Sequence, residues 1–148
     1  MKKLAIPSIG LSALAFTLCL VSFATAGHAD VVDDRATSMK RIRNSFRVLV
    51  EMAKAGTFDA ATAQNSAFEI VTEMMIFKDL FPAGSQHGDK LSRPEIWTDR
   101  AGFDAAWEVG DSAASKLGTV SEADVYVPAL QTLAAACRGC HKKYVTPQ

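Results

Sequence analysis

The 148-residue sequence has no run of five or more basic residues, no internal repeat and no low-complexity tract. Without a basic run, the chain lacks the charge pattern of nucleic-acid binding proteins and of proteins that attach to membrane surfaces. Without a repeat, it is not an array of stacked units. No stretch alternates apolar and polar residues as a half-buried strand does, so the signal for a β-sheet is also missing.

Cysteine is rare, and two of the three cysteines stand in a C-x-x-C-H motif at residues 137–141. In this motif two thiols, here Cys137 and Cys140, form thioethers with the vinyl groups of haem, and the adjoining His141 binds iron as the proximal ligand. A redox dithiol would need a βαβ context that the sequence does not show. A zinc site needs about four ligands, and His87 is the other candidate of the right type nearby. The motif predicts one covalent haem c.

Residues 1–29 have the pattern of a secretory signal peptide. Two lysines follow the initial methionine, an apolar region covers residues 11–23, and small-residue cleavage sites end at Ala26 and Ala29. Proline, glycine and serine residues interrupt the apolar stretch, which favours a cleaved signal over a permanent membrane anchor. Cys19 would be removed with the signal.

The mature chain is then a single haem domain at residues 30–148, large enough for one core. Removal of two lysines leaves 16 − 2 = 14 basic residues against 16 acidic ones, a net charge of −2. Bacterial c-type cytochromes acquire their haem after export, so the predicted location is the periplasm. Nucleic-acid binding and a stable membrane anchor are not expected.

Apolar residues recur at helical spacing in four segments. Their predicted buried faces are Met39, Ile42, Phe46, Leu49 and Ala53; Ala63, Ala67, Ile70, Met74 and Phe77; Phe103, Trp107, Gly110, Ala114 and Leu117; and Leu130, Leu133, Cys137, Cys140 and Tyr144. Asp59 is placed to cap the second helix, and Thr98 or Asp99 the third. Pro128 requires that the fourth helix begin near residue 125 or be kinked. The predicted fold is all-α, an antiparallel four-helix bundle with haem near the C-terminus of the last helix.

The residues alone leave the sixth iron ligand open. The candidates are Met39, Met52, Met74 and Met75, together with His87. Methionine often fills gaps in a core, and Met74 fits that role because it is in phase with its helix's apolar face. Met39 is also in phase, but helical phase does not distinguish a ligand from a core residue.

A C-terminal haem motif in an exported, all-helical chain of this length resembles the cytochrome c′ family. Similar segments are Arg35-x-x-x-Met39 and residues 93–97 with the following Asp99. The resemblance implies that Arg35 lies near a haem propionate and that Met39 faces the distal side of the haem. Through Met39 the chain resembles the low-spin branch of the family, in which a methionine at this position ligates iron. It also implies a homodimer formed through the first two helices.

His/Met ligation gives low-spin iron with a raised reduction potential, which suits an electron carrier that exchanges electrons with redox partner proteins. The alternative is a five-coordinate, high-spin cytochrome c′ that binds nitric oxide or carbon monoxide, with Met39 only packing the distal side. A small peroxidase would need an open iron site and a distal acid–base group, for which the sequence offers only Arg35. The sequence therefore predicts a carrier and not an enzyme.

Overall fold

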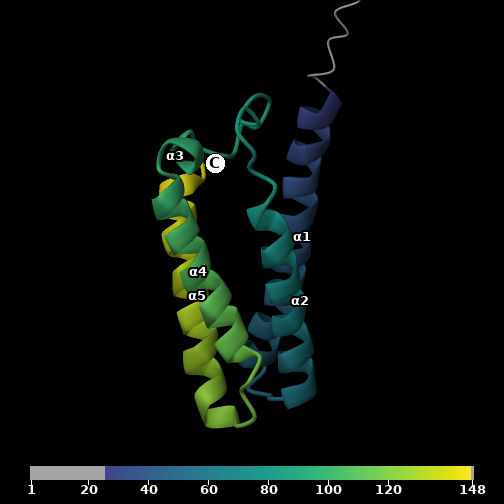
Figure 1. Ribbon diagram of the computed structural model, residues 1–148. Coiled ribbons are helices and arrows are strands. Elements are labelled where there is room, and N and C mark those ends of the chain that lie inside the picture. The colour runs from purple at the N-terminus through teal and green to yellow at the C-terminus, as the bar shows by residue number, and fades with distance from the viewer. Residues whose placement is uncertain (1–25, 148) are drawn as a thin grey trace, which may run out of the picture.

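The computed structural model describes residues 26–147, which form five helices. In chain order these are α1 (Ala26–Lys54), α2 (Ala60–Lys78), the single-turn α3 (Glu95–Thr98), α4 (Arg100–Leu117) and α5 (Ala123–Tyr144). The four long helices form an antiparallel bundle, and α3 lies at the end where α5 finishes (Figure 1). The predicted fold class is therefore confirmed. Most of the predicted signal, residues 1–25, lies outside the described residues.

The helix boundaries follow local sequence chemistry. The side chain of Asp59 caps α2 by accepting from the Thr62 backbone N–H at 2.7 Å, and Gly56 follows α1 with φ +65°, a conformation that glycine adopts without strain. The sequence left two possibilities for α5, a start near residue 125 or a kink at Pro128. The helix begins at Ala123, so Pro128 lies inside it, beyond the first turn. No described helix is long and apolar enough to span a membrane.

The long helices pack as two pairs, α1 with α2 and α4 with α5. The two pairs contact each other mainly through α2 and α4. Among the four long helices, the neighbours α1 and α5 pack least closely. The predicted faces of α2 and α4 are buried throughout, whereas Cys137 and Cys140 on α5 are partly buried against the core. Tyr126 is a core residue that the sequence pattern did not reveal. Its hydroxyl donates to the carbonyl oxygen of Leu49 at 2.6 Å and so joins α5 to α1.

A buried carboxylate lies between α1 and α2. Glu73 of α2 is 6% exposed, and its Oε2 accepts from the hydroxyl of Ser38 at 2.8 Å. Its Oε1 pairs with Nη1 of Arg41 at 2.9 Å. A carboxylate in this position is tolerated because both oxygens have partners.

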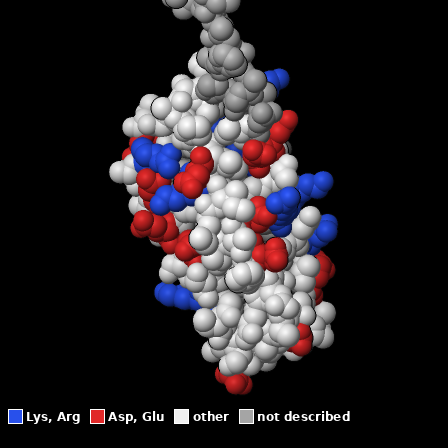
Figure 2. Space-filling model, turned by 45° about the vertical axis from the view of Figure 1, so that its right-hand side comes forward, with Lys and Arg blue, Asp and Glu red and all other residues white. Residues whose placement is uncertain are grey.

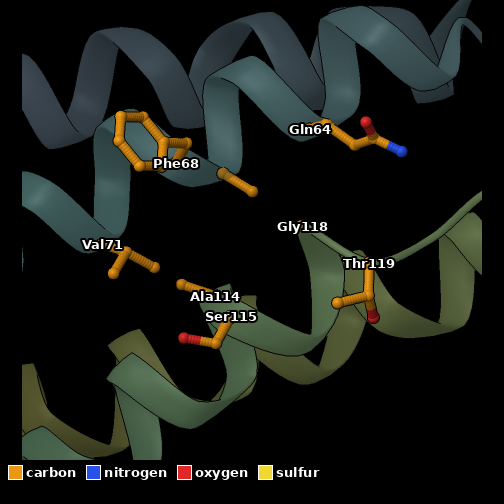
Figure 3. A pocket seen from close by; sticks show the side chains of 8 residues that line it. Gln64, Phe68, Val71, Ala114, Ser115, Gly118 and Thr119 are labelled. Carbon is orange, nitrogen blue, oxygen red and sulfur yellow. The ribbon is translucent and has the colours of Figure 1, made fainter.

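A shallow groove of about 230 Å³ runs along the outside of the bundle between α2 and α4. Figure 3 shows Phe68 and Val71 on one side of it and Ser115 and Thr119 on the other. None of its lining residues is titratable, and it lies near Gly118, at the end of the bundle away from the haem motif. We assign no chemistry to this groove.

Candidate functional site

The C-x-x-C-H motif occupies the last two turns of α5. The thiols of Cys137 and Cys140 are not joined in a disulfide, and both residues are partly buried against the core. A spacing of three residues places them on the same side of the helix. His141 follows directly and is an exposed residue. The local helix thus brings together the three side chains that the motif predicts.

The electrostatics of the motif distinguish it from a reactive dithiol. Burial raises the pKa of Cys137, and burial together with the neighbouring Cys137 raises the pKa of Cys140 to about 11. Both groups are therefore protonated thiols at neutral pH, whereas redox-active cysteines have lowered pKa values. Although the residue as a whole is exposed, the surrounding protein partly desolvates its imidazole and lowers the pKa of His141, so the neutral form, which binds metal, predominates at pH 7.

This donor set fits covalent haem. Two unpaired thiols on one side of a helix match the two vinyl groups, and a neutral imidazole beside them is available to iron. Cys137 and Cys140 would hold the group, with His141 as its proximal ligand. Among residues 26–147, no three His, Cys, Asp or Glu side chains gather as a metal site of their own.

The methionines differ in how their side chains are engaged. Met75 is 68% exposed, and Met74 is buried between α2 and α4. The sulfur of Met52 accepts from the backbone N–H of Asp59 at 3.3 Å, in the turn between α1 and α2. Met39 is partly buried against the core on α1. His87 is exposed in the connection between α2 and α3.

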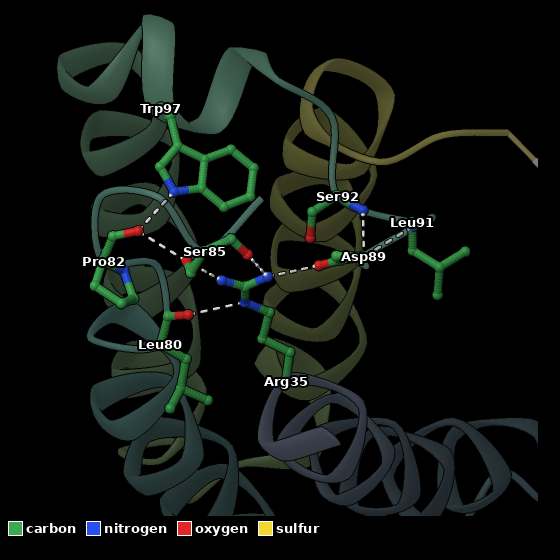
Figure 4. A network of polar contacts seen from close by, with 8 residues as sticks. All are labelled: Arg35, Leu80, Pro82, Ser85, Asp89, Leu91, Ser92 and Trp97. Atoms are coloured by element: carbon green, nitrogen blue, oxygen red, sulfur yellow. Dashed lines mark hydrogen bonds and ion pairs between the residues drawn. The ribbon is translucent and has the colours of Figure 1, made fainter. Parts of the chain in front are cut away.

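Arg35 is buried, and Figure 4 shows its guanidinium pointing into the loop after α2. Its Nε donates to the Leu80 carbonyl at 2.8 Å, and its Nη1 donates to the Ser85 carbonyl at 3.0 Å and to Oδ2 of Asp89 at 2.8 Å. Nη2 donates to the hydroxyl of Ser85, and the group lies 4.3 Å from the ring centroid of Phe81. These partners belong to the protein, so the predicted contact with a haem propionate stays a prediction.

The Arg35–Asp89 ion pair was not predicted, and it shields both side chains, which are 5% and 7% exposed. Burial acts to raise the pKa of Asp89, but hydrogen bonds from Ser92, Leu91 and Arg35 outweigh it and leave the pKa below its usual value. The two residues are 54 positions apart, and neither lies in a pattern that would have pointed to the other.

We expect Arg35→Met to lower the free energy of unfolding by about 3–5 kcal/mol, because it leaves the Asp89 carboxylate buried and unpaired. Urea denaturation at pH 7 measures this. Lys54→Met on the same helix is the control: its pair with Glu51 is exposed on both sides, so the loss should stay below about 1 kcal/mol. Equal losses in the two variants would contradict a special role for the buried pair.

The same pair gives a pH dependence. Because the folded-state pKa of Asp89 lies below its ordinary value of 3.8, the pair stabilises the fold fully above that pH. The contribution disappears as the pH falls through the folded-state pKa. The free energy of unfolding of the wild type should therefore approach that of Arg35→Met as the pH falls below 3.8, which urea denaturation at several pH values measures.

Comparisons with known proteins agree with this site. A family described as cytochrome C′ matches residues 30–145. A cytochrome c-556 from Agrobacterium tumefaciens strain II Chrys is 32% identical over 119 residues, which cover 78% of this chain and 97% of that protein. A cytochrome c′ from Rubrivivax gelatinosus is 28% identical over 120 residues, which cover 78% of this chain and 93% of that one.

A solved structure, cytochrome c prime from Shewanella frigidimarina, has the same fold. It superposes with a TM-score of 0.73 at 27% identity and covers 81% of this chain and 97% of its own. The residues matched by the family, 30–145, include Cys137, Cys140 and His141. The chain therefore belongs to the cytochrome c′ family, whose members are non-enzymatic proteins with one covalently attached haem c.

Proposed function

We propose that this chain is a periplasmic electron carrier whose single haem iron is low-spin and ligated by His141 and Met39. When bound, the haem supplies one-electron chemistry between ferric and ferrous iron. Matched relatives are named both cytochrome c-556 and cytochrome c′, so family membership does not by itself identify the sixth iron ligand. The ligand is therefore inferred from the residues of this chain. The proposal depends on where Met39 lies relative to the motif.

The observation that supports ligation by Met39 is its height along the bundle axis, which matches that of the haem motif. The hydrogen bond from Tyr126 to Leu49 fixes antiparallel α1 and α5 against each other. Met39 stands ten residues before Leu49, and Ala136 stands ten residues after Tyr126. At a rise of 1.5 Å per residue, both lie about 15 Å from that bond, toward the same end. Met39 is therefore level with the start of the haem motif, whereas Met52 lies beyond Leu49 toward the other end.

The neighbouring α1 and α5 helices are also the pair of long helices that packs least closely, which is where a flat cofactor between them is accommodated most easily. A thioether is a soft donor that favours ferrous iron and raises the reduction potential. Similar coordination in both oxidation states keeps reorganisation small. Met39 bound to the iron would leave no position open to external ligands, and such a site would suit electron transfer.

Arg35 lies one turn before Met39 on the same side of α1. A guanidinium has five N–H donors, and the protein contacts of Arg35 use four. In the proposed function the remaining N–H donates to a haem propionate.

An optical spectrum of the purified holoprotein tests this function. The reduced protein is expected to give a sharp low-spin pattern that carbon monoxide does not shift. A high-spin reduced spectrum that shifts under carbon monoxide would instead support the five-coordinate, gas-binding alternative, in which Met39 only packs against the haem.

Export to the periplasm is supported by the signal pattern at residues 1–29 and by the family. Cleavage after either Ala26 or Ala29 leaves Arg35, Met39 and the haem motif in the mature chain. N-terminal sequencing of protein from a periplasmic fraction locates the cleavage site.

The partners in this function are redox proteins and a second copy of the chain. Figure 2 shows positive and negative side chains interspersed on one face, so this face favours neither an acidic nor a basic redox partner. Phe68 and Met75, two turns apart on α2, are 67% and 68% exposed and supply apolar area for a homodimer. Sedimentation equilibrium of the holoprotein measures the association.

A further inference from the structure

The haem motif lies between two anchored points of α5. Leu133 is fully buried and Tyr144 is 1% exposed, whereas every residue from 134 to 143 is partly or largely exposed. The ring of Tyr144 packs edge-on against Phe103 of α4, with ring centroids 5.3 Å apart. Tyr144 is therefore the one deeply buried side chain that holds the helix beyond His141.

A single carboxylate, that of Asp99, binds this last turn. Its Oδ2 accepts from Nζ of Lys143 at 2.6 Å and from the hydroxyl of Tyr144 at 3.2 Å. Its Oδ1 accepts from the Gly102 backbone N–H at 3.2 Å and so caps α4. A Cβ on Gly102 would clash with this carboxylate, at 2.2 Å from its Oδ2. Asp99 thus joins the first turn of α4 to the last turn of α5.

Backbone contacts hold the same turn from another side. The N–H of Arg93 donates to the Tyr144 carbonyl at 3.0 Å, and the N–H of Thr146 donates to the Leu91 carbonyl at 2.8 Å. The last carbonyls of a helix lack partners within the helix, and helix ends fray when nothing else binds them. Here the C-terminal end of α5, which carries His141, is bound by the side chain of Asp99 and by the backbone of Leu91 and Arg93.

We propose that Asp99 is a positioning residue for the proximal imidazole. By fixing the last turn of α5 against the start of α4, it sets the direction of His141, which stands one turn before Tyr144. Asp99 acts on the imidazole through the helix, because its hydrogen bonds are to Lys143 and Tyr144, two and three residues after His141, and not to His141 itself. This inference rests on the proposed ligation of iron by His141.

The test measures the iron–imidazole bond itself. In ferrous Met39→Leu protein, which is expected to be high-spin, resonance Raman spectroscopy detects the iron–imidazole stretching band. Adding Asp99→Asn keeps an oxygen that caps Gly102 but removes the charge that binds Lys143. The band is expected to shift and broaden, and Lys143→Gln should change it in the same direction to a smaller extent.

Two matched controls separate this effect from a general change of charge. Asp104→Asn removes a carboxylate from the same helix, where it pairs with Arg100. Lys142→Gln removes the cation next to Lys143. Both should leave the band unchanged.

The outcomes distinguish the two proposals. If the Met39→Leu parent shows the iron–imidazole band and neither Asp99→Asn nor Lys143→Gln alters it, the positioning role alone is overturned. A parent that is high-spin but lacks that band would overturn ligation by His141, and with it the proposed function. A parent that stays low-spin would overturn ligation by Met39, and with it the proposed function. Lys143 is 55% exposed, so Lys143→Gln keeps the test valid if Asp99→Asn does not fold.

Discussion

Met39→Leu is expected to convert the reduced haem from low-spin to high-spin and to admit carbon monoxide. Leucine nearly conserves the volume of methionine, so the packing cost should stay below about 1.5 kcal/mol. If Met39 is the sixth ligand, as proposed, the substitution also removes the soft axial donor of the iron. The reduction potential should therefore fall, because the thioether stabilises ferrous iron. Optical spectra with and without carbon monoxide, together with a redox titration, measure all three changes.

Met52→Leu and Met74→Leu are the matched controls. Met52 bonds the turn between α1 and α2 through its sulfur, and Met74 packs between α2 and α4. Neither substitution should alter the spectrum, carbon monoxide binding or the potential. A low-spin spectrum that persists in Met39→Leu would move the ligand role to another residue.

The double variant Cys137→Ala with Cys140→Ala is expected to contain no haem after acid–acetone extraction. Thioether bonds survive this treatment, whereas non-covalently bound haem is removed. After the predicted signal peptide the sequence has no cysteine other than these two, so no other thiol of the predicted mature chain can replace them. Absorbance of the extracted protein measures the retained haem.

His141→Ala separates attachment from ligation in the same assay. It keeps both thiols and should retain part of the covalent haem, but it should lose the native spectrum because the proximal ligand is missing. Covalent haem retained in the double cysteine variant would refute the assignment of the motif.

The sequence predicted most of what local chemistry determines. The apolar faces of α2 and α4 and the caps at Asp59 and Asp99 follow from spacing and from the residue at each helix start. The haem motif is equally local, because its three functional side chains stand within five residues.

The contacts that the sequence did not reveal join distant residues. The hydrogen bond from Tyr126 to Leu49 spans 77 positions, and the ion pair of Arg35 with Asp89 spans 54. Periodicity shows which face of a helix is buried but not which residue of another element meets it. The loop that holds Asp89 has no periodic pattern at all, so its fold around the guanidinium depends on tertiary contacts.

The buried carboxylate of Glu73 fixes the height of Met39 along the bundle, on which its proposed bond to iron depends. Ser38 and Arg41, its two partners, stand on either side of Met39 in α1. If α1 slid along α2 by one residue, the sulfur would move about 1.5 Å and turn by about 100° around the helix axis. A metal–ligand bond tolerates only about 0.2 Å. Such a slide would also leave Glu73 buried without its partners. Helix α2 therefore fixes the position of α1, and with it that of the proposed ligand Met39, although α2 carries no residue of the haem motif.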